Sequence, residues 1–198
     1  MPKQRGRHSA NLPSTKEVIL HTAYKLFAMS GYENTSLRQI ASNAGVDAAL
    51  IVYQFSSKSG LWQAVIEYLR ELERPYIEHA AGLKDSERPS SELVRDMLRE
   101  FLKISRHVPE FPAFVNNERS SLERYGIIRE KIVIPLMDAY RPIISRAVEE
   151  GIFPECDEEV IFSFFLRGIS RTAADYDFPE DSTEEAQFTE FLYSMIKE

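Results

Sequence analysis

The stretch of sequence that decides the fold runs from residue 35 to residue 65 and reads TSLRQIASNAGVDAALIVYQFSSKSGLWQAV. Near its start, Ser36 and Gln39 have the spacing of a capping box, in which two side chains bond the free backbone amides at the beginning of a helix. Gly45 favours a helix end, because glycine adopts the left-handed conformation that follows many helices. The apolar residues between these signals recur at helical spacing and are Leu37, Ile40, Ala41 and Ala44. Together they predict one short amphipathic helix.

A second short helix is expected directly after the turn at Gly45 and Val46. Asp47 suits its N-terminal cap, and Ile51 and Phe55 lie one turn apart, so both can point into a shared core. Two short helices joined by a tight turn are typical of a helix-turn-helix, whose second helix enters the major groove of DNA. The residues left largely outside are Ala48, Ala49, Val52 and Tyr53.

The same run strongly resembles the DNA-binding domain of the TetR family of transcriptional regulators. The matching features are the Thr35-Ser36 pair, Ile40-Ala41, Ala44-Gly45-Val46 and Tyr53-x-Phe55-x-Ser57-Lys58, preceded by a helix with Ala23, Leu26, Phe27, Gly31 and Tyr32. Val52 and Ser59 depart from the usual pattern, which puts the transfer of a known operator sequence in doubt. The resemblance covers about residues 14–66. It implies an all-α protein with an N-terminal three-helix DNA-binding domain containing the helix-turn-helix, and a C-terminal helical ligand-binding and dimerisation domain.

The resemblance also implies which residues face the DNA. They are Ser36, Arg38, Ala48, Ala49, Leu50, Val52, Tyr53 and Gln54, with Lys58 on a phosphate. Arg38 can bond a guanine and Gln54 an adenine edge, whereas the apolar residues can contact only a thymine methyl group. Other interpretations stay open, since Tyr53 and Leu50 also suit core packing and Lys58 also suits a solvated charge.

The N-terminal segment predicts one further helix and an arm. Ser14 and Glu17 have capping-box spacing, so the first helix is expected from about Thr15 to Ser30, with Gly31 as its C-terminal cap. Residues 1–13 are expected to form a flexible basic arm, either reaching the minor groove or phosphates or serving as a solubilising tail. The basic residues of this arm are Lys3, Arg5 and Arg7.

Charge is divided unevenly along the chain. Residues 1–60 contain seven Lys and Arg but three Asp and Glu, a net charge of +4, which leaves −11 for the rest of a chain whose total is −7. Such asymmetry favours a nucleic-acid module attached to an acidic body, although chance alone can also produce a small excess.

The sequence divides into the arm at 1–13, a DNA-binding domain at 14–56, and an effector-binding and dimerisation domain at 57–198. A long helix is expected from Ser57 to the neighbourhood of Pro75, linking the two domains. Pro135 and Pro142 are expected to bend or break the longest of the helices that follow. The later helices are expected near 91–106, 110–122, 123–150, 158–176 and 183–197.

Two C-terminal segments are expected to pair with a second copy of the chain. Residues 160–170 read VIFSFFLRGIS and are apolar around most of a helix, so they need cover on more than one side. In TetR-like proteins the last two long helices form a four-helix bundle with their symmetry mates. The alternative is that both helices are buried in their own subunit. The interface residues implied are Phe164, Phe165, Gly168, Ile169, Thr172, Phe188, Phe191, Leu192 and Met195.

An effector pocket is expected between the domains, as the resemblance implies. Aromatic residues at helical spacing also suit an ordinary core, so both interpretations stay open. The apolar bias favours a small apolar or aromatic effector, with Arg119, Asn116 or Asn117 as its polar anchor. The pocket residues expected are Phe101, Phe111, Phe114, Asn117, Arg119, Tyr125, Met137 and Tyr140.

No catalytic motif, cofactor motif or metal site is predicted, because the four histidines are scattered and Cys156 has no neighbouring histidine in sequence. No apolar stretch suits a membrane span or a signal sequence, so a cytoplasmic protein is expected. The resulting hypothesis is a sequence-specific regulator that acts as a homodimer on a palindromic double-stranded operator. We expect a repressor released by a small effector; a TetR-like scaffold that organises chromosomes or division without a ligand is the alternative.

Overall fold

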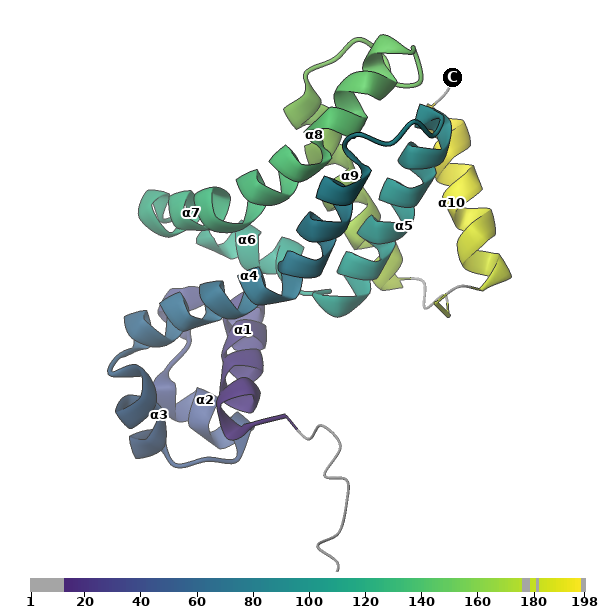
Figure 1. Cartoon of the computed structure of the whole chain (residues 1–198). Coiled ribbons are helices and arrows are strands. Elements are labelled where there is room, and N and C mark those ends of the chain that lie inside the picture. The colour runs from purple at the N-terminus through teal and green to yellow at the C-terminus, as the bar shows by residue number, and fades with distance from the viewer. Residues whose placement is uncertain (1–12, 176–178, 181, 197–198) are drawn as a thin grey trace, which may run out of the picture.

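The structure, a computed structural model, describes residues 13–175, 179–180 and 182–196, with side chains up to Ile169 in the first range. Every regular element in these ranges is a helix, so the predicted all-α class is confirmed (Figure 1). The elements are α1 (Thr15–Asn34), α2 (Leu37–Ala44), α3 (Ala48–Phe55), α4 (Lys58–Leu83), α5 (Ser90–His107), α6 (Phe111–Glu118), α7 (Leu122–Ile128), the π-helical segment η1 (Arg129–Val133), α8 (Ile134–Glu149), α9 (Glu158–Asp175) and α10 (Thr183–Ile196).

Helices α1, α2 and α3 form a small N-terminal head. The capping boxes predicted at Ser14 and Ser36 are both present, and the Asp47 side chain accepts a hydrogen bond from the Ala49 amide at 2.7 Å. These caps satisfy backbone groups that would otherwise lack partners at the helix starts. The core of the head contains the fully buried residues Ile19, Ala23, Phe27, Ile40 and Ile51.

Helix α1 runs beyond its predicted end at Ser30. Gly31 has φ 79° and ψ 161°, outside the helical region, so it ends the straight part of the helix as expected. One short turn then continues to Asn34. Buried Thr35 closes this end, because its hydroxyl donates to the Gly31 carbonyl at 2.8 Å and to the Leu26 carbonyl at 3.2 Å.

The turn between α3 and α4 is sterically tight. Ser56 has φ 66°, an unusual value for a residue with a side chain. A Cβ atom added at Gly60 would lie 2.1 Å from the Phe55 carbonyl oxygen, so only glycine fits there. The tight turn sets the angle between α3 and α4, and α4 is the helix that joins the head to the body (Figure 1).

Helix α4 does not end near Pro75, which corrects the prediction; it continues to Leu83. Proline removes one backbone hydrogen bond from a helix interior. Pro75 is exposed, so water can solvate the carbonyl that loses its partner, while Tyr76 and Ala80 are buried on the opposite side. Packing of that buried face holds the helix together across the proline.

The long segment expected at 123–150 is divided into α7, η1 and α8. The π-helical turn lies directly before Pro135, which occupies the first turn of α8 and has no amide hydrogen to donate. Pro142 lies inside α8, which is unbroken from Ile134 to Glu149. The predicted disruption is therefore found near Pro135 and is absent at Pro142.

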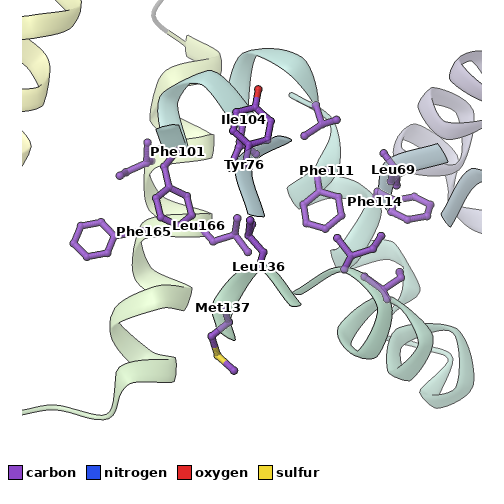
Figure 2. Close-up of a cluster of buried hydrophobic side chains, with 14 of the residues drawn as sticks. Leu69, Tyr76, Phe101, Ile104, Phe111, Phe114, Leu136, Met137, Phe165 and Leu166 are labelled. Atoms are coloured by element: carbon purple, nitrogen blue, oxygen red, sulfur yellow. The ribbon is translucent and has the colours of Figure 1, made fainter. Parts of the chain in front are cut away.

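The body is built around a buried aromatic cluster from α5, α8 and α9. The Phe101 ring lies 5.3 Å from the Tyr140 ring and 5.6 Å from the Phe162 ring, centroid to centroid. Figure 2 shows Phe101 beside Phe165 and Leu166 of α9, with Phe111 and Phe114 gathered near Leu69 of α4. The core thus continues from the body toward the head.

Candidate DNA interface and ligand cavity

Helix α3 presents a solvent-facing surface of the kind that a recognition helix requires. Tyr53 is 86% exposed and Val52 is 47% exposed, and Ala49 and Gln54 are exposed beside them. Arg38 on α2 is also exposed. Val52 and Tyr53 are neighbours on this surface, and contiguous exposed apolar groups often mark interaction sites, so this surface is a candidate contact surface.

Three of the expected DNA contacts have structural roles in the head. Ala48 and Leu50 are half-buried and pack against the core, because they lie on the inward-turning side of α3. The Ser36 hydroxyl accepts a hydrogen bond from the Gln39 amide at 3.2 Å, so this side chain caps α2. For Leu50 the structure therefore supports the packing alternative, whereas Tyr53 is too exposed for it, and Ala48 is less exposed than helical spacing predicts.

Lys58, for which a phosphate contact is expected, has its ammonium group bound within the head. Its Nζ donates to the carbonyl oxygens of Tyr32 at 2.8 Å, Thr35 at 3.0 Å and Glu33 at 3.5 Å. A lysine ammonium has three donors, and the C-terminal end of a helix carries partial negative charge. Lys58 is therefore a cap on the end of α1.

Tyr32 lies between two cations at the junction of head and body. Lys58 Nζ is 4.3 Å from the centre of its ring and Arg124 Cζ is 4.2 Å from it. Burial raises the pKa of Tyr32, and the positive charge of Arg124 offsets part of this effect. The phenol therefore stays neutral and attracts both cations through its ring.

Arg124 extends this junction into the body. Its Nε donates to a fully buried Glu118 carboxylate at 2.5 Å, and its terminal nitrogen donates to Glu33 at 3.1 Å. Glu118 ends α6 and Arg124 belongs to α7, whereas Glu33 belongs to α1. The ion pairs thus connect two helices of the body to the last turn of α1.

Helix α6 packs directly along α1. The Asn117 amide nitrogen donates to the Ala28 carbonyl at 2.7 Å, in the turn before the break in α1. The fully buried Phe114 ring lies 5.6 Å from Tyr24 of α1 and 6.4 Å from Trp62 of α4, centroid to centroid. One side of α6 is thereby fixed to both helices that position the helix-turn-helix.

The opposite side of α6 lines a cavity of about 420 Å³. This volume falls within the range typical of small-molecule sites. The π-helical segment contributes Arg129 and Val133, and π-helical turns often occur at functional sites. The full lining is Phe111, Pro112, Ala113, Val115, Asn116, Arg119, Tyr125, Arg129, Val133, Glu159, Ser163, Leu166 and Arg167.

Among the expected pocket residues, Phe111, Arg119 and Tyr125 line this cavity, as does Asn116. The other five do not line it. Asn117 faces α1 instead. Four belong to the closely packed core, because their positions on α5, α6 and α8 turn them inward, and these are Phe101, Phe114, Met137 and Tyr140. The cavity residues that sequence patterns missed come mostly from η1 and α9, which only the fold brings beside α6.

Helices α9 and α10 expose large apolar side chains. Phe164 is 65% exposed, Phe191 56% and Met195 63%, and Gly168 is exposed on the same helix as Phe164. Val160, which was not expected, is 56% exposed one turn before Phe164.

The other expected interface residues are less accessible or lie outside the description. Phe165 and Ile169 are each 3% exposed, because they turn toward the core of their own subunit, and this corrects their expected place at the interface. Phe188 and Leu192 are half-buried. The Thr172 side chain lies outside the described residues, and so do the expected arm residues Lys3, Arg5 and Arg7.

Among the residues that the structure describes, no cluster of three His, Cys, Asp or Glu side chains is placed to hold a metal ion. Within those same ranges, no helix has the length and apolar character needed to cross a membrane.

Known proteins resemble the head in sequence. Residues 19–65 match the family described as bacterial regulatory proteins, tetR family. The transcriptional repressor ComR of Escherichia coli is 32% identical over 180 residues, covering 86% of this chain and 83% of ComR. The chain belongs to the TetR family. Residues 19–65 therefore form a helix-turn-helix DNA-binding domain of this family, and the expectation that the chain is not an enzyme agrees with a family of transcriptional regulators.

Two further similarities concern another regulator and a solved structure. "Probable HTH-type transcriptional regulator YttP" of Bacillus subtilis is 29% identical over 138 residues, 70% of this chain and 65% of YttP, so the match spans less than two thirds of that protein. The crystal structure of Mycobacterium smegmatis AmtR superimposes with a TM-score of 0.67 at 20% identity, covering all of this chain and 90% of AmtR. At that identity the likeness supports the shared fold alone.

Proposed function

We propose that this TetR-family regulator is a homodimeric repressor that occupies a two-fold symmetric operator in the cytoplasm and leaves it when a small molecule enters the cavity. The observation that carries the proposal is the position of α6, which packs on α1 with one side and lines the cavity with the other. ComR, the relative at 32% identity, is described as a repressor, and this supports the same sign of regulation.

A dimer is proposed because one recognition helix contacts few base pairs. The exposed surface of α3 offers Val52, Tyr53 and Gln54, together with Arg38 from α2. Two such surfaces, related by two-fold symmetry and one helical turn of DNA apart, double the sequence that is recognised. Phe164 on α9 and Phe191 on α10 have exposed apolar side chains, which suit the interface between subunits.

Release is proposed to pass through the junction at Tyr32. We propose that a ligand beside Asn116 and Arg119 shifts α6, whose other side holds the Ala28 carbonyl through Asn117. Movement of α1 relative to α4 would change the distance between the two recognition helices. The ligand can weaken operator binding only by as much as it prefers the DNA-incompetent state.

The operator proposal is tested by selecting genomic fragments that bind the purified protein and mapping the protected bases. We expect a near-palindromic site, and scrambling one half-site should lower affinity by at least about 100-fold. Arg38→Ala should relax the preference at particular base pairs, since a bidentate arginine contributes roughly 1–3 kcal/mol of discrimination. Binding that is unaffected by scrambling one half-site would exclude the symmetric operator.

The release proposal is tested with a ligand found by thermal-shift screening. A coupling of about 1–3 kcal/mol should lower operator affinity about 5- to 150-fold, and by reciprocity the operator should weaken the ligand by the same factor. A cavity ligand that binds free and operator-bound dimer equally well would overturn release by that ligand. If the cavity binds nothing across the screen, the alternative of a DNA-binding scaffold is favoured.

A further inference from the structure

The arginines of this protein fall into two groups. Most of those whose side chains are described form ion pairs, for example Arg129 with Glu159 at 2.6 Å and Arg141 with Glu158 at 2.9 Å. Three form no ion pair with a described carboxylate, and they are Arg38, Arg119 and Arg167. Arg38 is exposed on α2 in the DNA-binding head, where it is expected to contact DNA. The other two lie at the cavity.

The cavity therefore has an excess of positive charge. Arg119 on α6 and Arg167 on α9 both line it, while the third cavity arginine, Arg129, is neutralised by Glu159 across the wall. The Arg119 guanidinium has only a distant contact with the Tyr125 ring, at 5.6 Å from its centre. Glu159 is the one carboxylate among the described residues that line the cavity, so three arginines face a single acid.

The remainder of the lining is largely apolar. Helix α6 contributes Phe111, Pro112 and Val115, and Val133 and buried Leu166 complete the wall. Arg119 and Arg167 are both exposed to solvent, so an uncharged ligand would leave their guanidinium groups to water and gain nothing from their charge. A highly charged ligand such as a nucleotide would lose the apolar contacts. The matching chemistry is an apolar chain or ring that ends in one carboxylate.

We propose that the cavity binds an amphipathic carboxylate, whose apolar part packs between α6 and the π-helical segment and whose carboxylate pairs with Arg119 and Arg167. Arginine suits this task, because its planar guanidinium donates two parallel hydrogen bonds to a carboxylate. This inference rests on the proposed function of the cavity as the effector site, and it replaces the general expectation of an apolar effector by a specific chemical class.

Two matched pairs of probes test the proposal by titration calorimetry with the full-length protein. Octanoate is compared with 1-octanol, and 3-phenylpropionate with 3-phenyl-1-propanol, so that each pair differs mainly in the carboxylate. In at least one pair we expect the acid to bind about ten-fold or more tightly than the alcohol. Equal binding of acid and alcohol in both pairs, or weaker binding of both acids, overturns the proposal, as does the absence of binding by all four probes.

Variants locate the carboxylate. Arg119→Gln and Arg167→Gln should each lower the affinity for the acid about ten-fold and leave the affinity for the alcohol unchanged. Arg74→Gln is the control, because Arg74 is 63% exposed on α4 and does not line the cavity. If the acid binds these arginine variants as tightly as the wild type, its carboxylate is held elsewhere and the proposal fails.

A gel-shift titration with operator DNA separates this inference from the proposed function. An acid that binds through Arg119 and Arg167 without lowering operator affinity would support the carboxylate site and contradict effector-controlled release. The opposite result is a neutral compound that binds the cavity and releases the operator while both acids bind no better than their alcohols. That result would support effector-controlled release and contradict the carboxylate site.

Discussion

At the scale of single residues, the linking helix α4 contains a buried carboxyl group, and its burial costs free energy. Glu73 is 7% exposed, and one of its oxygens has no hydrogen-bond partner within the described residues. Burial raises the pKa of Glu73 from 4.5 to about 9, with a smaller opposing effect from Arg70. The carboxyl is therefore protonated in the folded protein at neutral pH and ionised in the unfolded chain.

Because unfolding releases this proton, Glu73 should make stability decrease as pH rises from 4.5 toward 9. Glu73→Gln removes this titration, so the variant should gain stability relative to wild type by roughly 1 kcal/mol for each pH unit between pH 6 and pH 8. The measurement is the free energy of unfolding in urea at the two pH values. Glu71→Gln, at a carboxyl that is 70% exposed, is the control. A gain that is the same at both pH values would show that Glu73 is ionised in the folded state.

At the scale of secondary-structure elements, the sequence predicted most helices because their ends carry local signals. Ser14, Ser36 and Asp47 cap helices where their spacing indicated. The passage of α4 through Pro75 could not be predicted, since it depends on the packing of Tyr76 against the body. Local signals determine where a helix starts, but tertiary contacts decide whether it survives a proline.

The sequence predicted those parts of the candidate site whose residues lie within one continuous motif. The exposure of Tyr53 and Gln54 follows from helical spacing within one motif. The cavity combines residues of α6, α7, η1 and α9, as distant in sequence as Arg119 and Arg167. No periodic pattern marks such a set, because each member looks like an ordinary residue of its own helix.

The end of α1 supplies a prediction about how elements are joined. Lys58→Met keeps the apolar stem of the side chain but removes three hydrogen bonds to the carbonyls of Tyr32, Glu33 and Thr35. We expect a loss of about 1–3 kcal/mol in the free energy of unfolding and weaker operator binding. Lys25→Met is the matched control, because its ion pair with Glu110 at 3.5 Å is partly exposed and contributes less than about 1 kcal/mol.

The salt dependence of operator binding distinguishes a cap from a phosphate contact at Lys58. A lost phosphate contact lowers the slope of log affinity against log salt by about 0.9. We expect the slope of Lys58→Met to equal that of the wild type, because the Nζ is occupied within the head. A decrease of the slope by about one unit would show that Lys58 contacts a phosphate, as the resemblance implies.

At the scale of the whole molecule, the positive charge and the exposed apolar surface of the body lie in different parts of the chain. Residues 1–60 have a net charge of +4 and the remaining residues −11, so repulsion between the acidic body and phosphates orients the head toward DNA. Four large exposed apolar side chains lie on α9 and α10, namely Val160, Phe164, Phe191 and Met195, and Figure 1 shows α10 on the side of the body far from α3. A dimer that pairs through α9 and α10 would leave both α3 surfaces free to contact one operator.

This arrangement predicts that one substitution on α9 separates the subunits. In a two-fold interface every residue occurs twice, so Phe164→Glu removes two aromatic rings and introduces two like charges at once. We expect sedimentation to change from dimer to monomer at micromolar concentration, and operator affinity to fall on the order of 100-fold as the second head is lost. The fold should persist, because Phe164 is 65% exposed in the single chain. Leu122→Glu is the control, since Leu122 is 88% exposed and lies on α7, outside the proposed interface of α9 and α10. If Leu122→Glu separates the subunits and Phe164→Glu leaves them paired, the interface lies on α7 and the two heads are spaced by a different surface.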